Sequence, residues 1–280
     1  MEHRIIAIFC LIDEFLKEIG YKDDKRAYIS SSEILLMGYL AVSDFNGNYS
    51  KAHKYIMSMN LVKKIEYSRF IRRLSKLEKE IERLFMFLSK LFVKLNSMNI
   101  YSIDSFPVEL CNITREKQVK LWSDIKLKGY NASKKRYFYG FKVHMVVSQH
   151  KEPISLYISE GSMHDTTASY NLLPYLPDKS IAVGDKGYIS NKLESFLSVL
   201  GINLSPIYKQ NMKKDIDYFI KRKIRKGVET AFSVITSKFG KVIKATSISG
   251  FLIKLKLFIT AYSIDMFLKL DESKQRLAFN

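Results

Sequence analysis

The sequence contains few cysteines and few acidic residues, and each shortage excludes some classes of protein. Its two cysteines, Cys10 and Cys111, fit neither a metal-binding spacing nor a disulfide framework, which suits a reducing compartment. Against 46 lysines and arginines there are 28 aspartates and glutamates, a formal net charge of +18. This imbalance indicates a polyanionic partner or an anionic surface. Because 47% of the residues are hydrophobic, a packed protein that binds nucleic acid is favoured over a basic disordered tail.

No apolar run suits a signal peptide or a membrane span, and no low-complexity linker or internal repeat occurs. The run Ile5 to Ile12 is followed at once by Asp13 and Glu14, without a small-residue cleavage site, so it predicts an amphipathic first helix. The late run from Phe251 to Leu268 contains three charged residues, Lys254, Lys256 and Asp265. The sequence therefore predicts a cytoplasmic protein without a membrane partner.

Residues 1–98 have the periodicity of helices. Ser30 followed by Glu33 is typical of a capping box that opens a helix. A long helix is predicted to begin near Ser68, and its apolar residues alternate steps of three and four: Leu74, Leu77, Ile81, Leu84, Leu88, Leu91 and Leu95. Such a seam is either buried within its own domain or pairs two chains in a zipper, and burial is the favoured interpretation.

The start of this long helix is basic, with four residues that we predict as DNA contacts: Arg69, Arg72, Arg73 and Lys76. Several short helices with a basic helix start are compatible with a helix-turn-helix reader of DNA. A solvated helix face gives the same pattern. Residues 1–98 are therefore predicted to be a helical DNA-binding region.

From residue 99 to 280 the pattern is α/β. Three strands are predicted at 99–108, 137–149 and 153–161. Asp165 is expected to cap a helix over 166–173, and a strand at 181–183, a helix at 191–201, a fifth strand at 202–208 and further helices follow. This is the order of elements in an RNase H-like domain with a mixed sheet. The intervening segment 111–136 is irregular and basic, and it is the best candidate for a DNA-end contact within this domain through Arg115, Lys134, Lys135 and Arg136.

Two aspartates stand where such a fold presents ligands. Asp104 lies inside an apolar strand, where an acid is costly without a partner. Asp185 follows the fourth strand within Gly-Asp-Lys-Gly, which is a turn unless other acids converge on it. Magnesium takes carboxylate oxygens from a few side chains, and two ions roughly 3.5–4 Å apart can hold both oxygens of a phosphodiester exchange.

A third acid is expected on a late helix. Glu229 sits beside the apolar stripe of Val228, Phe232 and Ile235, so it can face the sheet. Arg225 precedes Glu229 by one helical turn on the same face, and a surface salt bridge between the two is the simpler interpretation for this pair alone. Three acids on the first strand, the fourth strand and a late helix form a more specific pattern than any one of them.

Several segments resemble the successive motifs of bacterial insertion-sequence DDE transposases, most closely the 982 family of insertion sequences. They are SIDSFPVELC, YFYGFKVHMVV, GSMHDTT, VGDKGYIS and RKGVETAFSVITSKFG, and the helical region with YSRFIRRL is also similar, so the resemblance spans nearly the whole chain. It implies an RNase H-like fold and strand cleavage and joining that depend on divalent metal. The catalytic and metal-binding triad implied is Asp104, Asp185 and Glu229, with Gly184 and Gly187 allowing close approach of DNA and metal.

One position departs from the wider superfamily, where a basic residue follows the catalytic glutamate by two turns. Here that position is Thr236, and Lys238 points elsewhere on the helix. Lys186 and Arg225 are candidates to hold phosphates. His144 is interpreted as a satisfied strand histidine, and Asp165 as a helix cap rather than a fourth ligand.

The function expected is that of a DNA transposase that uses two Mg²⁺ ions, with Mn²⁺ as an alternative, to cut at an element's ends and join them to target DNA. Its partners would be terminal inverted repeats and target DNA, and synapsis implies a homodimer or higher assembly on the bacterial nucleoid. Two alternatives stay open. One is a structure-selective nuclease on the same fold, and the other is an inactive or domesticated copy that only binds DNA.

Overall fold

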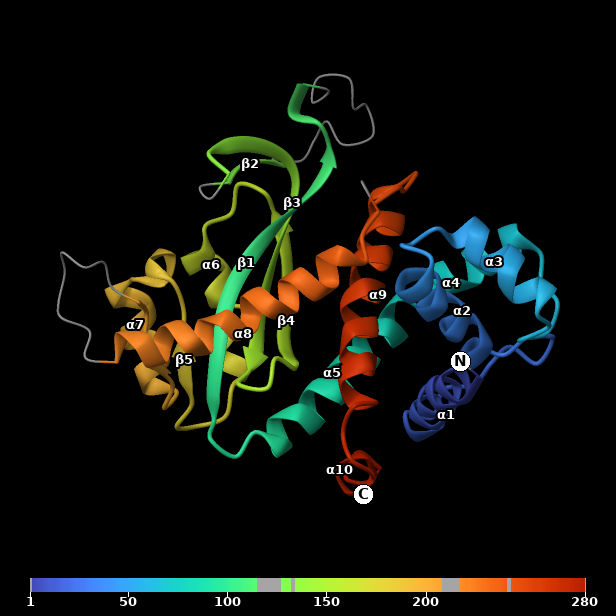
Figure 1. Cartoon of the computed structure of the whole chain (residues 1–280), viewed down its shortest axis with the longest axis horizontal. Coiled ribbons are helices and arrows are strands. Elements are labelled where there is room, and N and C mark those ends of the chain that lie inside the picture. The colour runs from blue at the N-terminus through green and yellow to red at the C-terminus, as the bar shows by residue number, and fades with distance from the viewer. Residues whose placement is uncertain (1, 115–126, 132–133, 208–216, 241–242, 280) are drawn as a thin grey trace. The chain divides into compact units, whose positions relative to one another are not determined.

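The computed structural model describes residues 2–114, 127–131, 134–207, 217–240 and 243–279 (Figure 1). The chain forms two compact units, one of residues 89–234 and the other of residues 1–88 together with 235–280. The ranges expected from the sequence were 1–98 and 99–280. The main difference is at the carboxyl end, because residues 235–280 pack with the amino-terminal helices.

The unit of residues 89–234 is built on one mixed sheet. Its strands are β1 (Ile100–Cys111), β2 (Lys128–Asn131), β3 (Arg136–Ser148), β4 (Pro153–Glu160), β5 (Ile181–Val183) and β6 (Asn203–Leu204). β1 is central, antiparallel to β3 and parallel to β5. β3 also pairs antiparallel with β4, and β5 pairs parallel with β6. The path β4-β3-β1-β5-β6 is the RNase H-like order, so the predicted fold class is confirmed.

The helices of this unit follow the predicted order with different lengths. After β4, the described residues contain α6 (Asp165–Ser169), α7 (Asn191–Val199) and α8 (Tyr218–Ser237), with the 3₁₀ turns η3 (Leu173–Tyr175) and η4 (Lys186–Tyr188). In Figure 1, α8 crosses in front of β1, and the rings of Phe106 on β1 and Phe232 on α8 lie 4.6 Å apart. Helix α8 thus packs its apolar stripe on the sheet and brings its polar residues beside β1.

Two strand predictions need correction. The segment 111–136, expected to be irregular, contains β2, which pairs with the start of β3. The fifth strand, expected over 202–208, is limited to Asn203–Leu204. Both differences concern short edge strands, whose pairing depends on neighbours distant in sequence rather than on local alternation.

The other unit is helical. Its helices are α1 (Glu2–Glu18), α2 (Ser31–Asp44), α3 (Tyr49–Ser58), α4 (Tyr67–Lys76), the first part of α5 (Glu78–Leu95), α9 (Ile248–Phe267) and α10 (Glu272–Arg276). The capping box of Ser30 and Glu33 opens α2 as predicted. None of the described helices is both long and apolar enough to cross a membrane.

Helices α2 and α9 form the centre of the helical unit, and both are buried on nearly all sides. Gly38 on α2 permits their close approach to α4, since a methyl group there would lie 3.0 Å from Leu74 and 3.5 Å from Leu257. On the rim, Lys256 of α9 bonds Glu78 at 2.5 Å and Glu82 at 2.6 Å. Helix α9 therefore completes the core that the amino-terminal helices begin.

The predicted long helix is two helices, because the chain breaks at Leu77 between α4 and α5. Its apolar seam is nevertheless buried except at the half-buried Leu95, as the favoured interpretation required: Leu74, Leu77, Ile81, Leu84, Leu88 and Leu91 are each at most 3% exposed. A zipper between two chains would need these side chains at the surface.

Candidate active site

Asp104 occupies the middle of the central strand. It lies opposite Met145 of β3, with the fully buried Ile103 before it. Its side chain is 18% exposed, and its Oδ1 accepts a 2.8 Å hydrogen bond from the backbone N–H of Ser105. Burial raises the pKa of Asp104 to about 6, although the Ser105 N–H and the Arg225 guanidinium both act to lower it. The charges of Asp185 and Asp165 raise it further.

Asp185 follows the strand parallel to β1. Ser102 is opposite Val183, so the same register continued by two residues places Asp185 beside Asp104. The Oδ1 of Asp185 accepts a 2.7 Å hydrogen bond from the Gly187 N–H and thereby caps η4. Asp185 is therefore a turn residue in local structure and lies within electrostatic range of Asp104.

Glu229 and Arg225 lie one turn apart on α8. Arg225 Nη2 is 3.0 Å from Glu229 Oε1 and 3.6 Å from Asp104 Oδ2. Glu229 is about half exposed and Arg225 is 31% exposed. The ion pair with Glu229 is present, as the simpler interpretation predicted, but it is directed at the sheet and not only at solvent. Arg225 thus connects the carboxylates of β1 and α8.

Asp165 is a fourth carboxylate in this region, and its predicted capping role is wrong. The N-cap of α6 is His164, whose side chain makes no capping bond, and Asp165 is the first helical residue. Its Oδ1 instead accepts a 2.8 Å hydrogen bond from Ser105 Oγ. Lys142 Nζ and His144 Nδ1 each lie 3.4 Å from the same oxygen. Asp165 is therefore joined to the strand residue that follows Asp104.

His144 is fully buried and belongs to this group. Its Nε2 is 2.8 Å from Ser159 Oγ on β4, while Nδ1 faces Asp165 without a hydrogen bond in the described part of the chain. Burial lowers the pKa of His144 to about 4, and Asp165 opposes that shift. The prediction of a satisfied strand histidine holds for Nε2 alone.

The two glycines beside Asp185 have different surroundings. A methyl group on Gly187 would lie 2.9 Å from Asp185 Oδ1 and 3.6 Å from Asp165 Oδ2, so this position lies between the two carboxylates. Gly184 is buried, and a methyl group there would lie 2.8 Å from the Tyr188 ring. The expectation that Gly184 allows DNA to approach is therefore wrong, because Tyr188 fills that space.

The donor set has the chemistry that hard divalent cations prefer, since it consists of carboxylates, although Arg225 lies near Asp104 and Glu229 and Lys142 lies near Asp165. The buried Asp104, whose charged form is disfavoured by burial, would be stabilised by a bound cation. In the described residues, however, no three His, Cys, Asp or Glu side chains are gathered closely enough to hold a metal ion. Glu229 instead lies against Arg225.

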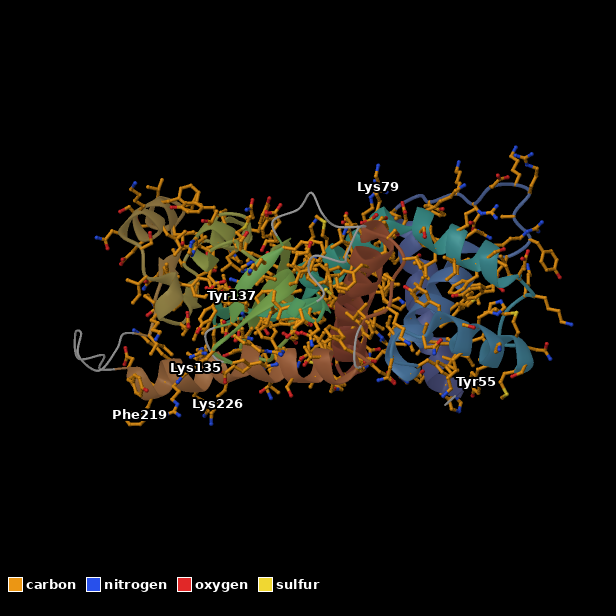
Figure 2. All side chains as sticks on the ribbon, turned by 90° about the horizontal axis from the view of Figure 1, so that it is seen from above. Tyr55, Lys79, Lys135, Tyr137, Phe219 and Lys226 are labelled. Atoms are coloured by element: carbon orange, nitrogen blue, oxygen red, sulfur yellow. The ribbon has the colours of Figure 1, made fainter. Side chains whose placement is uncertain are left out.

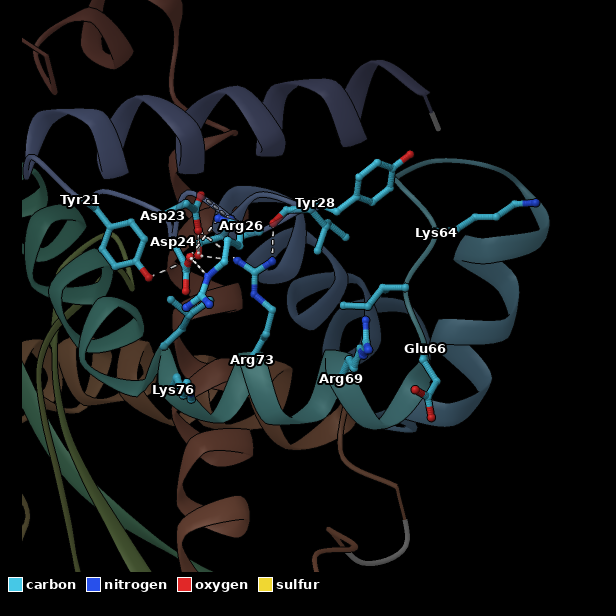
Figure 3. A pocket seen from close by; sticks show the side chains of 15 residues that line it. Tyr21, Asp23, Asp24, Arg26, Tyr28, Lys64, Glu66, Arg69, Arg73 and Lys76 are labelled. Carbon is cyan, nitrogen blue, oxygen red and sulfur yellow. Dashed lines mark hydrogen bonds and ion pairs between the residues drawn. The ribbon is translucent and has the colours of Figure 1, made fainter.

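The predicted DNA contacts of the helical unit lie along α4, whose Phe70 and Leu74 face the core. Arg69, Arg72 and Lys76 are exposed, but Arg73 is held internally by Asp23 at 3.0 Å and by the carbonyl of Ile29. Figure 3 shows these bonds in a pocket of about 630 Å³ that Arg69, Arg73 and Lys76 line.

The remaining predicted DNA contacts belong to the sheet unit. Lys134 and Lys135 are exposed between β2 and β3, and Arg136 is ion-paired with Glu109 of β1. Lys186 is exposed at the start of η4, directly after Asp185. Arg115 lies outside the described residues.

An RNase H-like sheet with carboxylates on its central strand and just after the neighbouring parallel strand defines an α/β domain suited to phosphodiester chemistry. A family model described as "Transposase DDE domain" matches residues 94–240, which is more than half of the chain and includes all four carboxylates above. The chain belongs to this family of DDE transposases. Such enzymes cut and join DNA and depend on divalent metal ions.

A similar solved structure is the "piggyBac transposase synaptic complex with hairpin DNA". It is 12% identical in sequence, with a TM-score of 0.46 over 99% of this chain and 78% of that chain. Comparison with curated proteins found no match.

Proposed function

We propose that the chain is the transposase of a bacterial insertion sequence, similar to the 982 family. It would cut DNA at the element's ends and join the freed 3′-hydroxyl to target DNA by transesterification, without a covalent protein intermediate. The observation that supports a working site is the position of Arg225, whose guanidinium lies near both Asp104 and Glu229. In an inactive copy, catalysis would place no constraint on Arg225, Asp104 and Glu229, and their convergence would not be expected.

Asp104, Asp185 and Glu229 are proposed to hold two Mg²⁺ ions, or Mn²⁺ in their place. The bound metal would supply activation of water and stabilisation of charge on the scissile phosphate. Since Asp104 is already desolvated, its carboxylate is predisposed to accept a cation in place of water. Glu229 would have to exchange its contact with Arg225 for the metal.

Arg225 would then be released toward the DNA. Its planar guanidinium can take a phosphate oxygen while a second N–H keeps its contact with a carboxylate. Lys186, exposed beside Asp185, would contact a flanking phosphate as a point charge. Arg69, Arg72 and Lys76 of α4 are proposed to contact the terminal repeat, with a homodimer or larger assembly pairing two ends.

The test uses the purified full-length chain and a linear DNA with the inverted repeats that flank its gene. With Mg²⁺, we expect cleavage at the repeat ends and joining of those ends to a second DNA. Cleavage at junctions without regard to the repeats, and without joining, would instead identify a structure-selective nuclease. Binding without any cleavage would identify an inactive DNA-binding protein.

A further inference from the structure

The hairpin formed by β2 and the start of β3 carries two exposed tyrosines side by side. Tyr130 and Tyr137 are cross-strand partners, so their side chains are on the same face of the sheet. Their ring centroids lie 5.1 Å apart in an edge-to-face arrangement, and the residues are 52% and 57% exposed. Each ring therefore presents a large apolar surface to solvent.

Lysines surround this pair. Lys128 Nζ lies 5.5 Å from the centre of the Tyr137 ring. Lys134 and Lys135 are exposed in the connection between the strands, with Lys135 and Tyr137 labelled in Figure 2. Arg136, at the start of β3, is ion-paired with Glu109 of β1. The surface is thus aromatic and positively charged.

This combination favours nucleic acid over protein as the partner. Protein interfaces are depleted of lysine at their centres. Surfaces that bind single-stranded nucleic acid instead combine aromatic rings, which stack on bases, with cationic side chains, which contact the neighbouring phosphates. An aromatic ring stacks on any base, but only where the base is unpaired or unstacked. The lysines would hold the backbone without regard to sequence.

The strand register places the hairpin relative to the candidate active site. Asp104 is opposite Met145, and Tyr137 precedes Met145 by eight residues on the same strand. At roughly 3.4 Å per residue, the tyrosines lie roughly 27 Å from Asp104 along β3. That length corresponds to about eight base steps of DNA. One DNA molecule can therefore reach both sites.

We propose that Tyr130 and Tyr137 form a stacking platform for unpaired bases in the DNA that the enzyme cuts. This inference rests on the proposed function for the identity of the DNA, but the stacking itself needs no cleavage. It assigns the tyrosines a role distinct from that of the lysines, which contribute charge alone.

The test measures the affinity of the full-length protein for two labelled DNAs by fluorescence anisotropy at fixed salt. One is a fully paired duplex, and the other is the same duplex with a single-stranded tail of about ten nucleotides, longer than the reach estimated above. Tyr130→Ala and Tyr137→Ala should each weaken binding of the tailed DNA about tenfold and leave the paired duplex unchanged. Tyr130→Phe and Tyr137→Phe should bind like the unmodified protein, because stacking does not require the hydroxyl.

Two controls separate stacking from charge and from damage to the fold. Tyr175→Ala removes another exposed tyrosine of the same unit, 78% exposed, and should change neither affinity. Lys134→Ala should weaken binding of both DNAs alike and reduce its salt dependence. Thermal melting confirms that each variant is folded.

Equal affinity of the alanine variants and the unmodified protein for the tailed DNA would overturn the proposal. A loss of dimer mass in solution, with DNA affinity unchanged, would also overturn it and assign the tyrosines to contact between two copies of the chain. A protein that binds tailed DNA through these tyrosines but never cuts would refute the proposed function while leaving the platform intact.

Discussion

The guanidinium of Arg225 on α8 lies 3.6 Å from the carboxylate of Asp104 on β1. The same Nη2 atom is 3.0 Å from Glu229, so one cation joins two acids from elements more than a hundred residues apart in sequence. An arginine in this position offsets the repulsion between the two carboxylates. The predictions below test this arrangement and its surroundings.

The first prediction concerns the three acids. Asp104→Asn, Asp185→Asn and Glu229→Gln should each abolish Mg²⁺-dependent cleavage, because each removes a charged oxygen ligand. DNA affinity should stay nearly unchanged, since it comes mostly from lysine and arginine contacts to phosphate. Cleavage of labelled repeat ends and anisotropy binding are measured on the same preparations. A variant that still cuts would remove its residue from the metal site.

Arg225 should be intolerant even of lysine. Arg225→Ala and Arg225→Lys are both expected to reduce cleavage about 100-fold, because a point charge cannot bind a phosphate oxygen and a carboxylate at once as a planar guanidinium can. The partly exposed ion pair contributes under roughly 1 kcal/mol to stability, so the variants should melt close to the unmodified protein. Arg222→Ala, which removes an exposed arginine one turn earlier on α8, is the matched control. Full activity of the lysine variant would show that the geometry is unimportant.

Asp165 should act by positioning its neighbours. Because Asp165 accepts a hydrogen bond from the Ser105 hydroxyl and faces Lys142 and His144, its removal should make Ser105, the residue next to Asp104, less well held. Asp165→Ala is expected to lower Mn²⁺ affinity about tenfold, which calorimetry measures independently of cleavage. Ser105→Ala should lower it through the same bond, and the double variant should be no worse than Asp165→Ala alone. Glu194→Ala, an exposed acid on α7, should have no effect.

The raised pKa of Asp104 predicts a pH-dependent cost to stability in the metal-free protein. Its pKa rises from 3.8 to about 6 on folding, so the folded state binds the proton more tightly than the unfolded state. The charged carboxylate therefore destabilises the fold above pH 6, and the penalty fades as the pH falls from 6 to 4. Asp104→Asn should be more stable at pH 8 by about 2–3 kcal/mol and equal near pH 4. Urea unfolding with a chelator present, repeated across this range, provides the measurement, and a constant difference would contradict it.

The helical unit should not fold from its amino-terminal part alone. A fragment of residues 1–98 lacks α9, which packs against α2 and α4, so their apolar faces would be exposed to water. We expect low cooperativity in thermal unfolding by circular dichroism and strong binding of a hydrophobic dye. Repeat recognition is therefore better tested in the full chain with Arg69→Ala and Arg72→Ala. A cooperative melt of the fragment would refute this expectation.

Some features were predictable because they are local. Asp104 is an acid inside an apolar strand, and the capping box at Ser30 is a short-range signature, so both were found from the sequence. The role of Asp165 was predicted wrongly because that prediction also used only local sequence. It follows a histidine and precedes two threonines, a pattern typical of a cap, and the side-chain partner that decides its role is sixty residues away at Ser105.

Other features depend on tertiary contacts that no local pattern records. The heptad pattern continues through Leu77, where the structure breaks the helix without proline or glycine. The charges in the run from Phe251 to Leu268 argue against a membrane span, but nothing in the run says which residues bury α9. The contacts of Arg225 could be stated only as alternatives, because an i,i+4 pair is compatible with either face of a helix.

The helical unit joins the first 88 residues to residues 235–280, so its two parts are synthesised at different times. At about 5–20 residues per second, roughly 7 to 30 seconds of translation separate its two parts. During that interval α2 and α4 have been synthesised but lack α9 as a packing partner, while the whole sheet unit is synthesised and can fold. A premature stop codon between α8 and α9 would therefore leave the sheet unit whole with its four carboxylates, attached to amino-terminal helices that lack the helix completing their core.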